Sequence, residues 1–533
     1  MSVQAFQRAK PGAAVALMIT VLAAWFLAEA ILQGTSYLLV PLAVFAAVIV
    51  LLQTLKDWRK GVLFFLTWML FEDLARKYLG NNMAVYFAKD VLAAACCLSF
   101  YAARTPKRIL HTRPRFVLLF ACFFFWSLLE VFNPNSPSLW YGLLGLKLYF
   151  GYAPLFFLGY ALIKNASDLR RFLAVNMVIA ALISLLGVAQ AAAGKTLLSP
   201  AELAPDIREL GSLMRTAPIT GETFLRPPSV FVSDGRYGSY LLLALLLGLG
   251  ATTYFFLQRL PRRKWLIGAM VLIMAAILLS AVRGTLMWAI ITAGVFILAY
   301  APEMRSKGAH LRRIGTAISA TALLGISSVV FLSVYYPEAL NSRVAFYRQT
   351  LLPSSSKFEL TARIWDYPVS EFRKVFTFPN WPLGYGTGTC SLGAQYVTRI
   401  LGAAPSGIGI ESGFGNLILE MGIPGLMLWL AWSCTLLVAE WKVVHQLRGT
   451  ALFPLGFIIF WFSLITLVPS MLSGLGIENF VTNAYFFLLT GVLFSLPALR
   501  YGDLPAYSDT GVREKAAGAD LHRVLGKSMP LPG

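Results

Sequence analysis

Several charged side chains of this sequence lie in apolar surroundings, where they could do chemistry. Arg283 is the single charged residue of the segment AAILLSAVRGTLMWAIITAGVFILAY, residues 275–300. An arginine in hydrocarbon costs at least about 2.5 kcal/mol, so it persists where water or an anion offsets that cost. Because a guanidinium stays charged and grips phosphate oxygens through paired N–H groups, Arg283 is a candidate contact for a phosphate or diphosphate.

Two further segments bring charged residues close to apolar runs. Arg226 and Arg236 flank the turn-rich stretch RPPSVFVSDGR, and the stretch LTARIWDYP contains Arg363 and Asp366. The alternative for Arg226 and Arg236 is an ordinary solvated loop charge or a contact with lipid headgroups. The alternative for the stretch around Arg363 is a surface helix with ordinary salt bridges. Their position beside apolar spans makes them candidates for the same anion as Arg283.

The segment IGIESGFGNLILEMGIPGLMLWL, residues 408–430, carries two carboxylates and an amide. Glu411 lies just outside an apolar run, Asn416 and Glu420 lie inside it, and the sequence GIPG at 422–425 interrupts it. Ionisable residues inside a membrane span are functional-site candidates by default. The alternative is a structural Glu420 that is hydrogen-bonded to a neighbouring helix.

Composition places all of these residues in a membrane protein. The 533 residues are 58% hydrophobic and 13% charged, with a mean hydropathy of +0.68. Water-soluble proteins have about a quarter charged residues. The net charge of +20 would suggest nucleic acid in a soluble protein, but here the basic residues cluster in short segments between apolar runs. Such clustering is what the positive-inside rule requires, so most of the charge reports membrane topology.

Apolar runs long enough to cross about 30 Å of hydrocarbon predict an all-α polytopic integral membrane protein with about 14 transmembrane helices. The approximate starts of these helices are Ala13, Tyr37, Gly61, Ala84, Arg115, Tyr141, Arg171, Tyr237, Trp265, Gly284, Ile314, Gly413, Leu452 and Asn483. Residues 265–300 as one helix would be about 54 Å long, so Arg283 is expected at a tight hairpin between two spans. The short basic connections all fall on one side, which we expect to be the cytoplasm together with both termini.

This topology predicts six parts of the chain. They are the N-terminal helices 1–193 with about seven spans, a first periplasmic loop 194–236, about four spans with the Arg283 hairpin in 237–336, a large periplasmic loop 337–410, about three spans in 411–500, and a disordered cytoplasmic tail 501–533. Long outward loops are where function tends to lie.

The large loop carries two features of its own. Apolar residues at helical intervals between 358 and 376 predict a short amphipathic helix over the membrane surface. The glycine-rich stretch GYGTGT at 384–389 lacks a preceding strand and faces a compartment without nucleotides. A nucleotide-binding role for this stretch is therefore rejected.

Four segments, in this order, resemble a known family. They are FLRPPSVFVSDGRYGSYL, LLSAVRGTL, LTARIWDYP leading to PLGYGTGT, and ESGFGNLILEMGIPGLMLWL. Together they resemble the O-antigen ligase and Wzy-type polymerase superfamily over roughly residues 199–430, and FEDLARKYLGNNMAVYFAKDVL at 71–92 resembles its exopolysaccharide-type members. The resemblance implies a multi-span glycosyltransferase at the periplasmic face of the bacterial inner membrane, acting on glycans linked to undecaprenyl diphosphate. It also implies that Arg283 and Arg363 contact the diphosphate.

One departure from the family pattern bears on the reaction. Ligases place a histidine before the stretch E-x-G-I-x-G, and Glu411 occupies that position here. All four histidines are expected on the cytoplasmic side: His111, His310, His445 and His522. This favours a polymerase that builds exopolysaccharide, capsule or O-antigen. An O-antigen ligase or protein O-oligosaccharyltransferase is the alternative, and a flippase or secondary transporter is a more distant one.

The implied chemistry needs few protein groups. A sugar whose C1 carries a diphosphate is already activated, so no cofactor is expected, and the sequence shows no metal-ligand spacing. Glu411 is expected to accept the proton of the acceptor hydroxyl, with Asp366 as the second choice. The residues expected to bind diphosphate and glycan are Arg226, Arg236, Arg283, Arg363, Asn416 and Glu420. Expected partners are the lipid-linked oligosaccharides, membrane lipid, and the chain-length regulator and flippase of the same pathway, with no nucleic acid.

Overall fold

The computed structural model is a helical membrane protein. It describes residues 36–78, 83–103, 115–198, 213–260, 263–305, 329–330, 332–351, 365–391, 397, 408–472, 474 and 476–502. Among these residues, eight helices are long and apolar enough to cross a membrane. Three shorter apolar helices accompany them: Phe45–Lys56, Lys264–Leu279 and Arg283–Ala299. The α-helical membrane class is therefore confirmed, whereas the count of about 14 spans stays a prediction.

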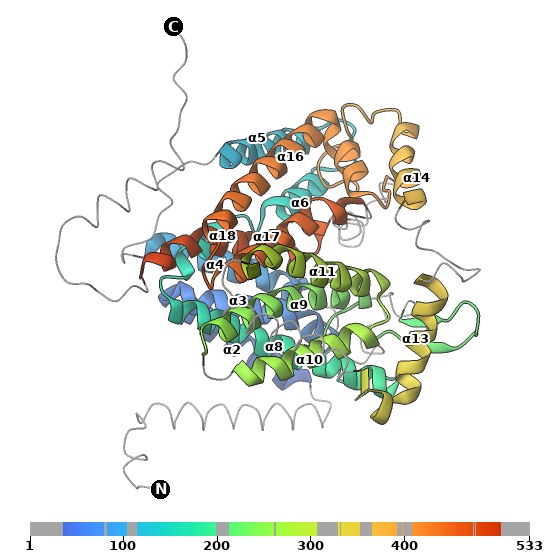
Figure 1. Cartoon of the computed structure of the whole chain (residues 1–533). Coiled ribbons are helices and arrows are strands. Elements are labelled where there is room, and N and C mark those ends of the chain that lie inside the picture. The colour runs from blue at the N-terminus through green and yellow to red at the C-terminus, as the bar shows by residue number, and fades with distance from the viewer. Residues whose placement is uncertain are drawn as a thin grey trace, which may run out of the picture. The chain divides into compact units, whose positions relative to one another are not determined.

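The described helices follow the apolar runs of the sequence (Figure 1). They are α2 (Ser36–Lys56), α3 (Trp58–Tyr78), α4 (Met83–Ala102), α5 (Arg115–Leu129), α6 (Leu139–Phe150), α7 (Leu155–Leu162), α8 (Ala166–Ala193), α9 (Asp234–Leu257), α10 (Arg263–Leu279), α11 (Arg283–Arg305), α13 (Pro337–Leu351), α14 (Tyr367–Lys374), α16 (Gly413–Gln446), α17 (Phe453–Leu467) and α18 (Phe480–Gly502). Most of the predicted starts lie within a few residues of an observed one. The predicted starts Ala13 and Ile314, and nearly all of the predicted tail, lie outside the described residues.

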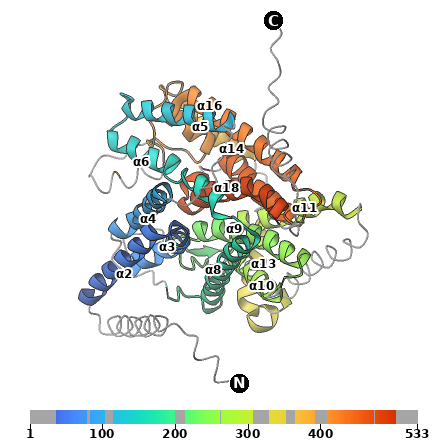
Figure 2. The same cartoon turned by 90° about the vertical axis from the view of Figure 1, so that its left-hand side faces the viewer.

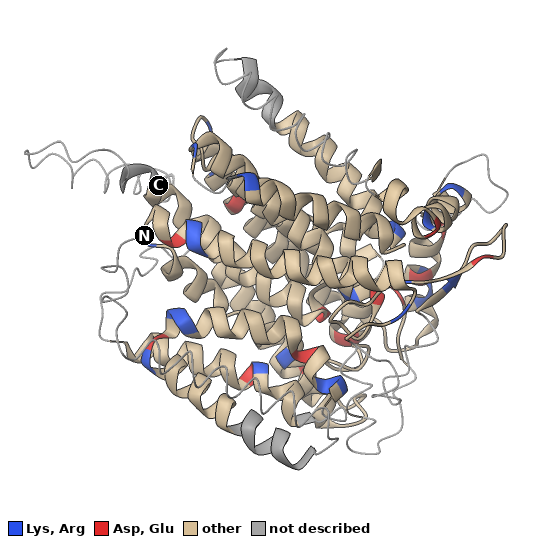
Figure 3. Ribbon diagram, turned by 90° about the horizontal axis from the view of Figure 1, so that it is seen from below, with Lys and Arg blue, Asp and Glu red and all other residues tan. Residues whose placement is uncertain are grey.

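Polar residues at the ends of the apolar runs fix where several helices begin. The side chain of Ser233 accepts a hydrogen bond from the Arg236 N–H, and that of Ser412 accepts one from the Gly415 N–H. Such caps satisfy backbone donors that have no partner inside the helix. In Figure 3, many charged positions lie toward the ends of helices, and long uncharged stretches lie between them.

The chain divides into two compact units. The first comprises residues 1–66 and 91–103, and the second comprises residues 67–90 and 104–533. In the first unit, the hydroxyl of Ser99 donates to the Leu55 carbonyl at 3.0 Å, and Trp58 meets Phe100 edge-on. Every described candidate site residue lies in the second unit.

Close helix packing builds the second unit. α5 packs along α16, α7 along α18, α17 along α9, and α10 against α8 and α9 (Figures 1 and 2). Small residues allow the closest approach: a Cβ at Gly159 of α7 would lie 2.1 Å from the Leu488 carbonyl oxygen of α18, and one at Gly491 would lie 2.0 Å from that of Phe156. Because lipid removes the hydrophobic drive between helices, such tight contacts are the main attraction available.

Two predicted interruptions of helices are present. α10 ends at Leu279 and α11 begins at Arg283, and between them Ala281 adopts a left-handed φ of 54°. α16 breaks at Gly422, whose φ of 66° and ψ of −170° are not helical. Arg283 is therefore the first residue of its helix, at the break that the length of the apolar run requires.

The glycine-rich stretch 384–389 and the nearby Pro382 form hydrogen bonds with backbone groups that have no helical partner at the break in α16. The N–H of Gly386 donates to the Glu420 carbonyl at 2.9 Å, and the N–H of Tyr385 donates to that of Leu419 at 2.7 Å. On the other side of the break, the N–H of Ile423 donates to the Pro382 carbonyl at 3.0 Å. Non-helical backbone inside a membrane protein is tolerated where protein satisfies it in this way. The stretch therefore packs against the break in α16 and supplies its missing backbone partners.

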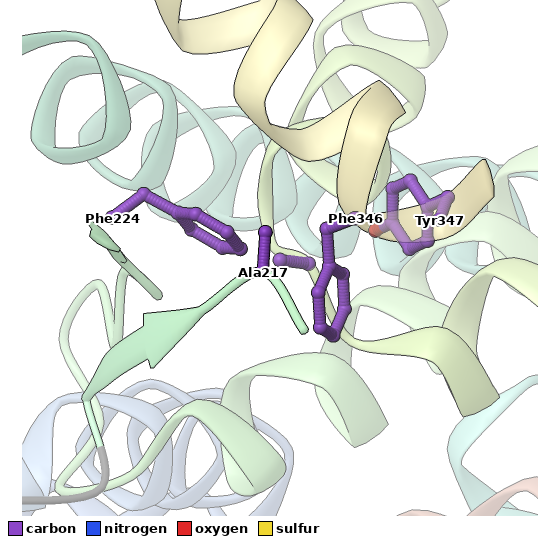
Figure 4. Close-up of a cluster of buried hydrophobic side chains, with 5 residues drawn as sticks. Ala217, Phe224, Phe346 and Tyr347 are labelled. Atoms are coloured by element: carbon purple, nitrogen blue, oxygen red, sulfur yellow. The ribbon is translucent and has the colours of Figure 1, made fainter. Parts of the chain in front are cut away.

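A small hairpin and α13 come from the two predicted outward loops. β1 (Met214–Thr216) pairs antiparallel with β2 (Thr223–Leu225). Phe224 of the hairpin and Phe346 of α13 lie on either side of Ala217, with ring centres 5.5 Å apart (Figure 4). The two loops, more than a hundred residues apart in sequence, therefore share one apolar core.

The predicted amphipathic helix is partly described. α14 and the 3-10 turn η6 (Val375–Thr377) cover its second half, and residues 358–364 lie outside the described residues. Val375 is buried against Ile418 and Leu419 at the start of α16, whereas Trp365 and Phe376 are exposed. One face of the described half therefore packs against α16, and apolar side chains on the other side are exposed.

Candidate functional site

The site residues fall into separate groups, and the first is a set of arginines beside the hairpin. It consists of Arg215 on β1, Arg226 directly after β2, and Arg283 at the start of α11, and is called the arginine group below. Burial lowers the pKa of Arg226, the carboxylate of Asp234 opposes this, and the positive charges of Arg215 and Arg283 lower the pKa further. The charges of Arg215 and Arg283 therefore both act on the guanidinium of Arg226.

Each member of the arginine group is held differently. The guanidinium of Arg226 forms an ion pair with Asp234 at the start of α9. The backbone N–H of Arg226 donates to the Leu213 carbonyl at 2.7 Å. The guanidinium of Arg283 lies over the ring of Phe346, 5.4 Å from the ring centre, and its side chain is half-buried. Arg215 is exposed. The hairpin and α13 thus carry the contacts that orient these cations.

Arg343, on α13, holds this region together and was not foreseen as a candidate. Its guanidinium donates to the carbonyls of Leu225 at 2.8 Å, Leu279 at 3.3 Å and Ala191 at 3.4 Å. Leu279 is the last residue of α10 and Ala191 lies in the last turn of α8, where a cation is favourable. Burial lowers the pKa of Arg343 to about 10, so it is still a cation at neutral pH. Its role is to fix α13 over the helix ends.

Arg236, which was expected to bind substrate, has a carboxylate partner of its own. Its guanidinium donates to both oxygens of Asp73 in α3, at 3.1 and 3.0 Å. The same carboxylate accepts the N–H of Val232 at 3.1 Å and pairs with Arg76 at 3.4 Å. Arg236 therefore ties the start of α9 to α3, whether or not it also contacts a substrate.

Glu411 belongs to a second set of residues at the start of α16. The hydroxyl of Tyr367 donates to the exposed Glu411 carboxylate, and the Glu411 N–H donates to the carboxylate of Glu371 at 3.1 Å. Lys374 also donates to Glu371 and is the largest cause of the lowered pKa of that carboxyl. Tyr367, Glu371 and Glu411 are called the Glu411 group below. An exposed carboxylate with an oriented neighbour has the access that a general base needs.

Asn416 and Glu420 have structural contacts in the same helix. The side-chain oxygen of Asn416 accepts the Ile410 N–H at 3.3 Å. Glu420 is fully buried and accepts the Tyr149 hydroxyl at 2.9 Å and the Cys390 N–H at 3.0 Å. These contacts anchor the glycine-rich stretch and α6 to α16. They are the neighbouring-helix hydrogen bonds that the structural alternative for Glu420 predicts.

Of the remaining two candidates, the structure describes only Asp366, which precedes α14. Asp366 is exposed and directly precedes Tyr367, whose hydroxyl reaches Glu411. Arg363 lies outside the described residues. Sequence reasoning missed Arg215, Arg343, Tyr367 and Glu371, because each meets its partners only when segments that are apart in the sequence come together in the fold. Their one sequence signal was their place in loops already expected to carry function.

The fold and these groups define a class: an α-helical membrane protein with a cationic group and an exposed carboxylate near the ends of its spans. No protein-family model, no curated protein and no solved structure matches the chain. Function must therefore be inferred from the residues and their geometry.

Proposed function

We propose that this chain is a polysaccharide polymerase, a membrane glycosyltransferase that joins oligosaccharide repeat units linked to undecaprenyl diphosphate. The observation that carries the proposal is the arginine group. In support of it, the charges of Arg215 and Arg283 both lower the pKa of Arg226, and Arg226 and Arg283 are two of the residues expected from sequence to bind the diphosphate. Guanidiniums are the side chains best suited to bind a diphosphate that leaves as an anion.

The proposed reaction is a displacement at the sugar carbon that carries the diphosphate. The acceptor hydroxyl oxygen forms a bond to C1, and the bond between C1 and the diphosphate oxygen breaks with its electron pair on the diphosphate. Arginines stabilise the negative charge that develops there, which commonly contributes about 3–4 kcal/mol per donor. The hydroxyl proton passes to Glu411, with Asp366 as the alternative acceptor. The activated sugar supplies the free energy, so no nucleotide takes part.

The proposal includes a location and an orientation. The apolar runs suggest about 14 spans, and the basic connections suggest cytoplasmic termini. The resemblance suggests a bacterial inner membrane and a periplasmic site. A cysteine replacing the exposed Glu222 of the hairpin is then expected to react with an impermeant thiol reagent in intact spheroplasts. A cysteine replacing the exposed Lys442 near the end of α16 is expected to react after lysis alone. The opposite pattern would contradict the orientation.

Deleting the gene tests the reaction. A polymerase predicts that single lipid-linked repeats accumulate and that polymer is lost, with both restored by the wild-type gene. Full-length polymer that stays unattached would indicate the ligase alternative instead. Repeats retained on the cytoplasmic side would indicate a flippase. Arg283→Ala, expressed at wild-type level, is expected to behave like the deletion.

A further inference from the structure

Glu440 is a buried carboxyl at a place where three helices meet, away from the groups described so far. It lies toward the end of α16 that is opposite to Glu411, and its side chain is fully buried. The hydroxyls of Ser463 in α17 and Thr490 in α18 both donate to Glu440 Oε1, each at 3.0 Å. All three helices are long and apolar enough to span a membrane, and both hydroxyls lie near the middle of their helices. The carboxyl is therefore held in the interior of the helix bundle.

The second carboxyl oxygen of Glu440 has no partner. Among the described residues, no group lies within hydrogen-bond distance of Oε2, and this atom is buried. Two other buried carboxyls are held differently: Glu72 pairs with Lys89, and Glu420 accepts a hydrogen bond at each of its oxygens. Glu440 differs from both, because it has neither a cation nor a donor for each oxygen in the described part of the chain.

The helices packed against Glu440 bring no described cation to it. α17 contains no charged residue. Arg500, the charged residue of α18, lies ten positions beyond Thr490, or about 15 Å along the helix, and its side chain is outside the described residues. The described titratable side chains of α5, α16 and α18 near this junction have other settings: Arg115, Cys122, Cys434, Lys442 and His445 are exposed, and Tyr485 donates to Asn176.

An ionised Glu440 would be a lone charge in an apolar interior. Desolvation of such a charge is so unfavourable that buried groups without a counter-charge neutralise instead. One proton removes the charge and, unlike a larger cation, requires no cavity. Because both hydroxyls donate to Oε1, the free oxygen that can carry this proton is Oε2.

We propose that Glu440 is a proton-binding site, with the proton on Oε2, and that it joins α16, α17 and α18 as a neutral acid. The site is independent of the proposed glycosyl transfer, since it shares no residue with the arginine group or the Glu411 group. Loss of the proton would leave a charge without a partner between the three helices. Packing of this half of α16 therefore depends on one bound proton.

Infrared spectroscopy detects the proton directly. A protonated carboxyl has a C=O stretching band that is separate from the two bands of a carboxylate. Purified full-length protein in nanodiscs at neutral pH is compared with Glu440→Gln, and the wild type is expected to show one additional protonated-carboxyl band. Glu338→Gln, at an exposed glutamate of α13, is the matched control and is expected to remove carboxylate bands only. Loss of carboxylate bands in Glu440→Gln would overturn the inference.

Thermal unfolding separates a neutral acid from a required charge. Glutamine has nearly the shape of the neutral acid and still accepts both hydroxyl hydrogen bonds, so Glu440→Gln is expected to keep the wild-type unfolding temperature. Glu440→Leu leaves the hydroxyls of Ser463 and Thr490 without this acceptor and is expected to lower it. A Glu440→Gln protein that unfolds as early as Glu440→Leu, or that fails to fold, would show that the charge is needed and would refute the neutral acid.

A bound metal cation is the alternative occupant. A cation that binds only the folded protein would raise the unfolding temperature as its concentration rises. Wild-type protein is expected to unfold at the same temperature in sodium, potassium and choline chloride of equal ionic strength. Stabilisation by sodium or potassium that disappears in Glu440→Gln would assign the site to that metal ion and reject the proton.

Discussion

Three cations surround the ring of Tyr86 in α4: Arg76, Lys89 and Lys147. These residues, together with Glu72, are called the Tyr86 cluster here. The Tyr86 cluster and the arginine group both gather cations, and their charge is compensated in different ways. Lys89, inside the Tyr86 cluster, is fully buried and has Glu72 as its partner at 2.8 Å. Arg215, in the arginine group, is exposed on a three-residue strand, and Arg226 beside it pairs with Asp234. Buried cations need fixed partners because desolvation is expensive, whereas exposed ones keep water until an anion replaces it.

This difference predicts which substitutions should lower stability and which should lower activity. Substitution of a buried paired residue such as Lys89 should lower stability, since it leaves its partner as a lone buried charge. Substitution of a more exposed residue such as Arg283 should lower activity at little cost to stability. The expected outcomes below test this division, beginning with the largest effect.

The largest effect is expected from breaking the buried pair. Lys89→Met leaves Glu72 without its cation in a buried position and is expected to destabilise the protein by about 3–5 kcal/mol. Arg215→Met, on the exposed hairpin, is expected to stay within about 0.5 kcal/mol of wild type. Thermal unfolding of the purified proteins in one detergent measures both. Similar shifts for the two variants would remove the distinction between the regions.

A large effect on activity alone is expected from the arginine group. Arg283→Ala should reduce polymer formation by on the order of 10²–10³-fold, as expected when a donor that stabilises a developing anion is lost. Arg226→Ala should cause a similar loss and also lower stability, because it leaves the buried Asp234 without its cation. Lys at either position should restore part of the activity, because it keeps the charge and loses the planar fork. Polymer length and amount, normalised to membrane-inserted protein, provide the measurement. Arg259→Ala, at the exposed far end of α9, is the matched control, and equal losses there would point to a general defect.

A smaller effect is expected from the Glu411 group. Glu411→Gln keeps size and hydrogen bonding but cannot accept a proton, so the rate should fall by about 10²-fold with donor binding retained. Tyr367→Phe should cost less, because it removes a hydrogen bond to the base and not the base itself. Normal polymerisation by Glu411→Gln together with failure of Asp366→Asn would move the proton acceptor to Asp366. Full activity of both variants would mean that no side-chain base is needed.

A modest effect on stability is expected from Tyr149. Tyr149→Phe removes one hydrogen bond to the buried Glu420 and is expected to cost about 1 kcal/mol. Polymer formation per folded molecule should be unchanged, since this carboxylate anchors the glycine-rich stretch. A selective loss of activity with normal stability would instead give Glu420 a part in the reaction.

The smallest effect concerns pH. Because Lys374 lowers the pKa of Glu371 below the ordinary value of 4.5, this carboxylate stabilises the folded state above that pH and stops doing so as the pH falls through its lowered pKa. Lys374→Met should reduce the loss of unfolding free energy that occurs below pH 4.5. The change should be less than about 1 kcal/mol, because the lysine is exposed. Unfolding curves at pH 7 and at stepwise lower pH values measure it. An unchanged acid profile would show that the pair contributes nothing.

The sequence by itself determined the helices and their interruptions. Apolar length predicted the starts of α9, α10 and α16 to within a few residues and the break before Arg283, and the sequence GIPG predicted the break at Gly422. These features could be predicted because hydrocarbon admits a helix of limited length and little else, so local composition is sufficient. The same reasoning selected Arg226 and Arg283, which tertiary contacts then placed together.

The tertiary structure alone decided which charges have partners. Arg236 and Arg226 read alike in the sequence, but one meets Asp73 of α3 and the other meets Asp234 beside the arginine group. Likewise Glu411 is exposed and Glu420 is buried against Tyr149 of another helix, although the two lie nine positions apart. The cost of a charge depends on what surrounds it in space, and those neighbours come from segments far away in the chain. No local pattern could have shown that Lys89 of α4 and Glu72 of α3 form a fully buried pair.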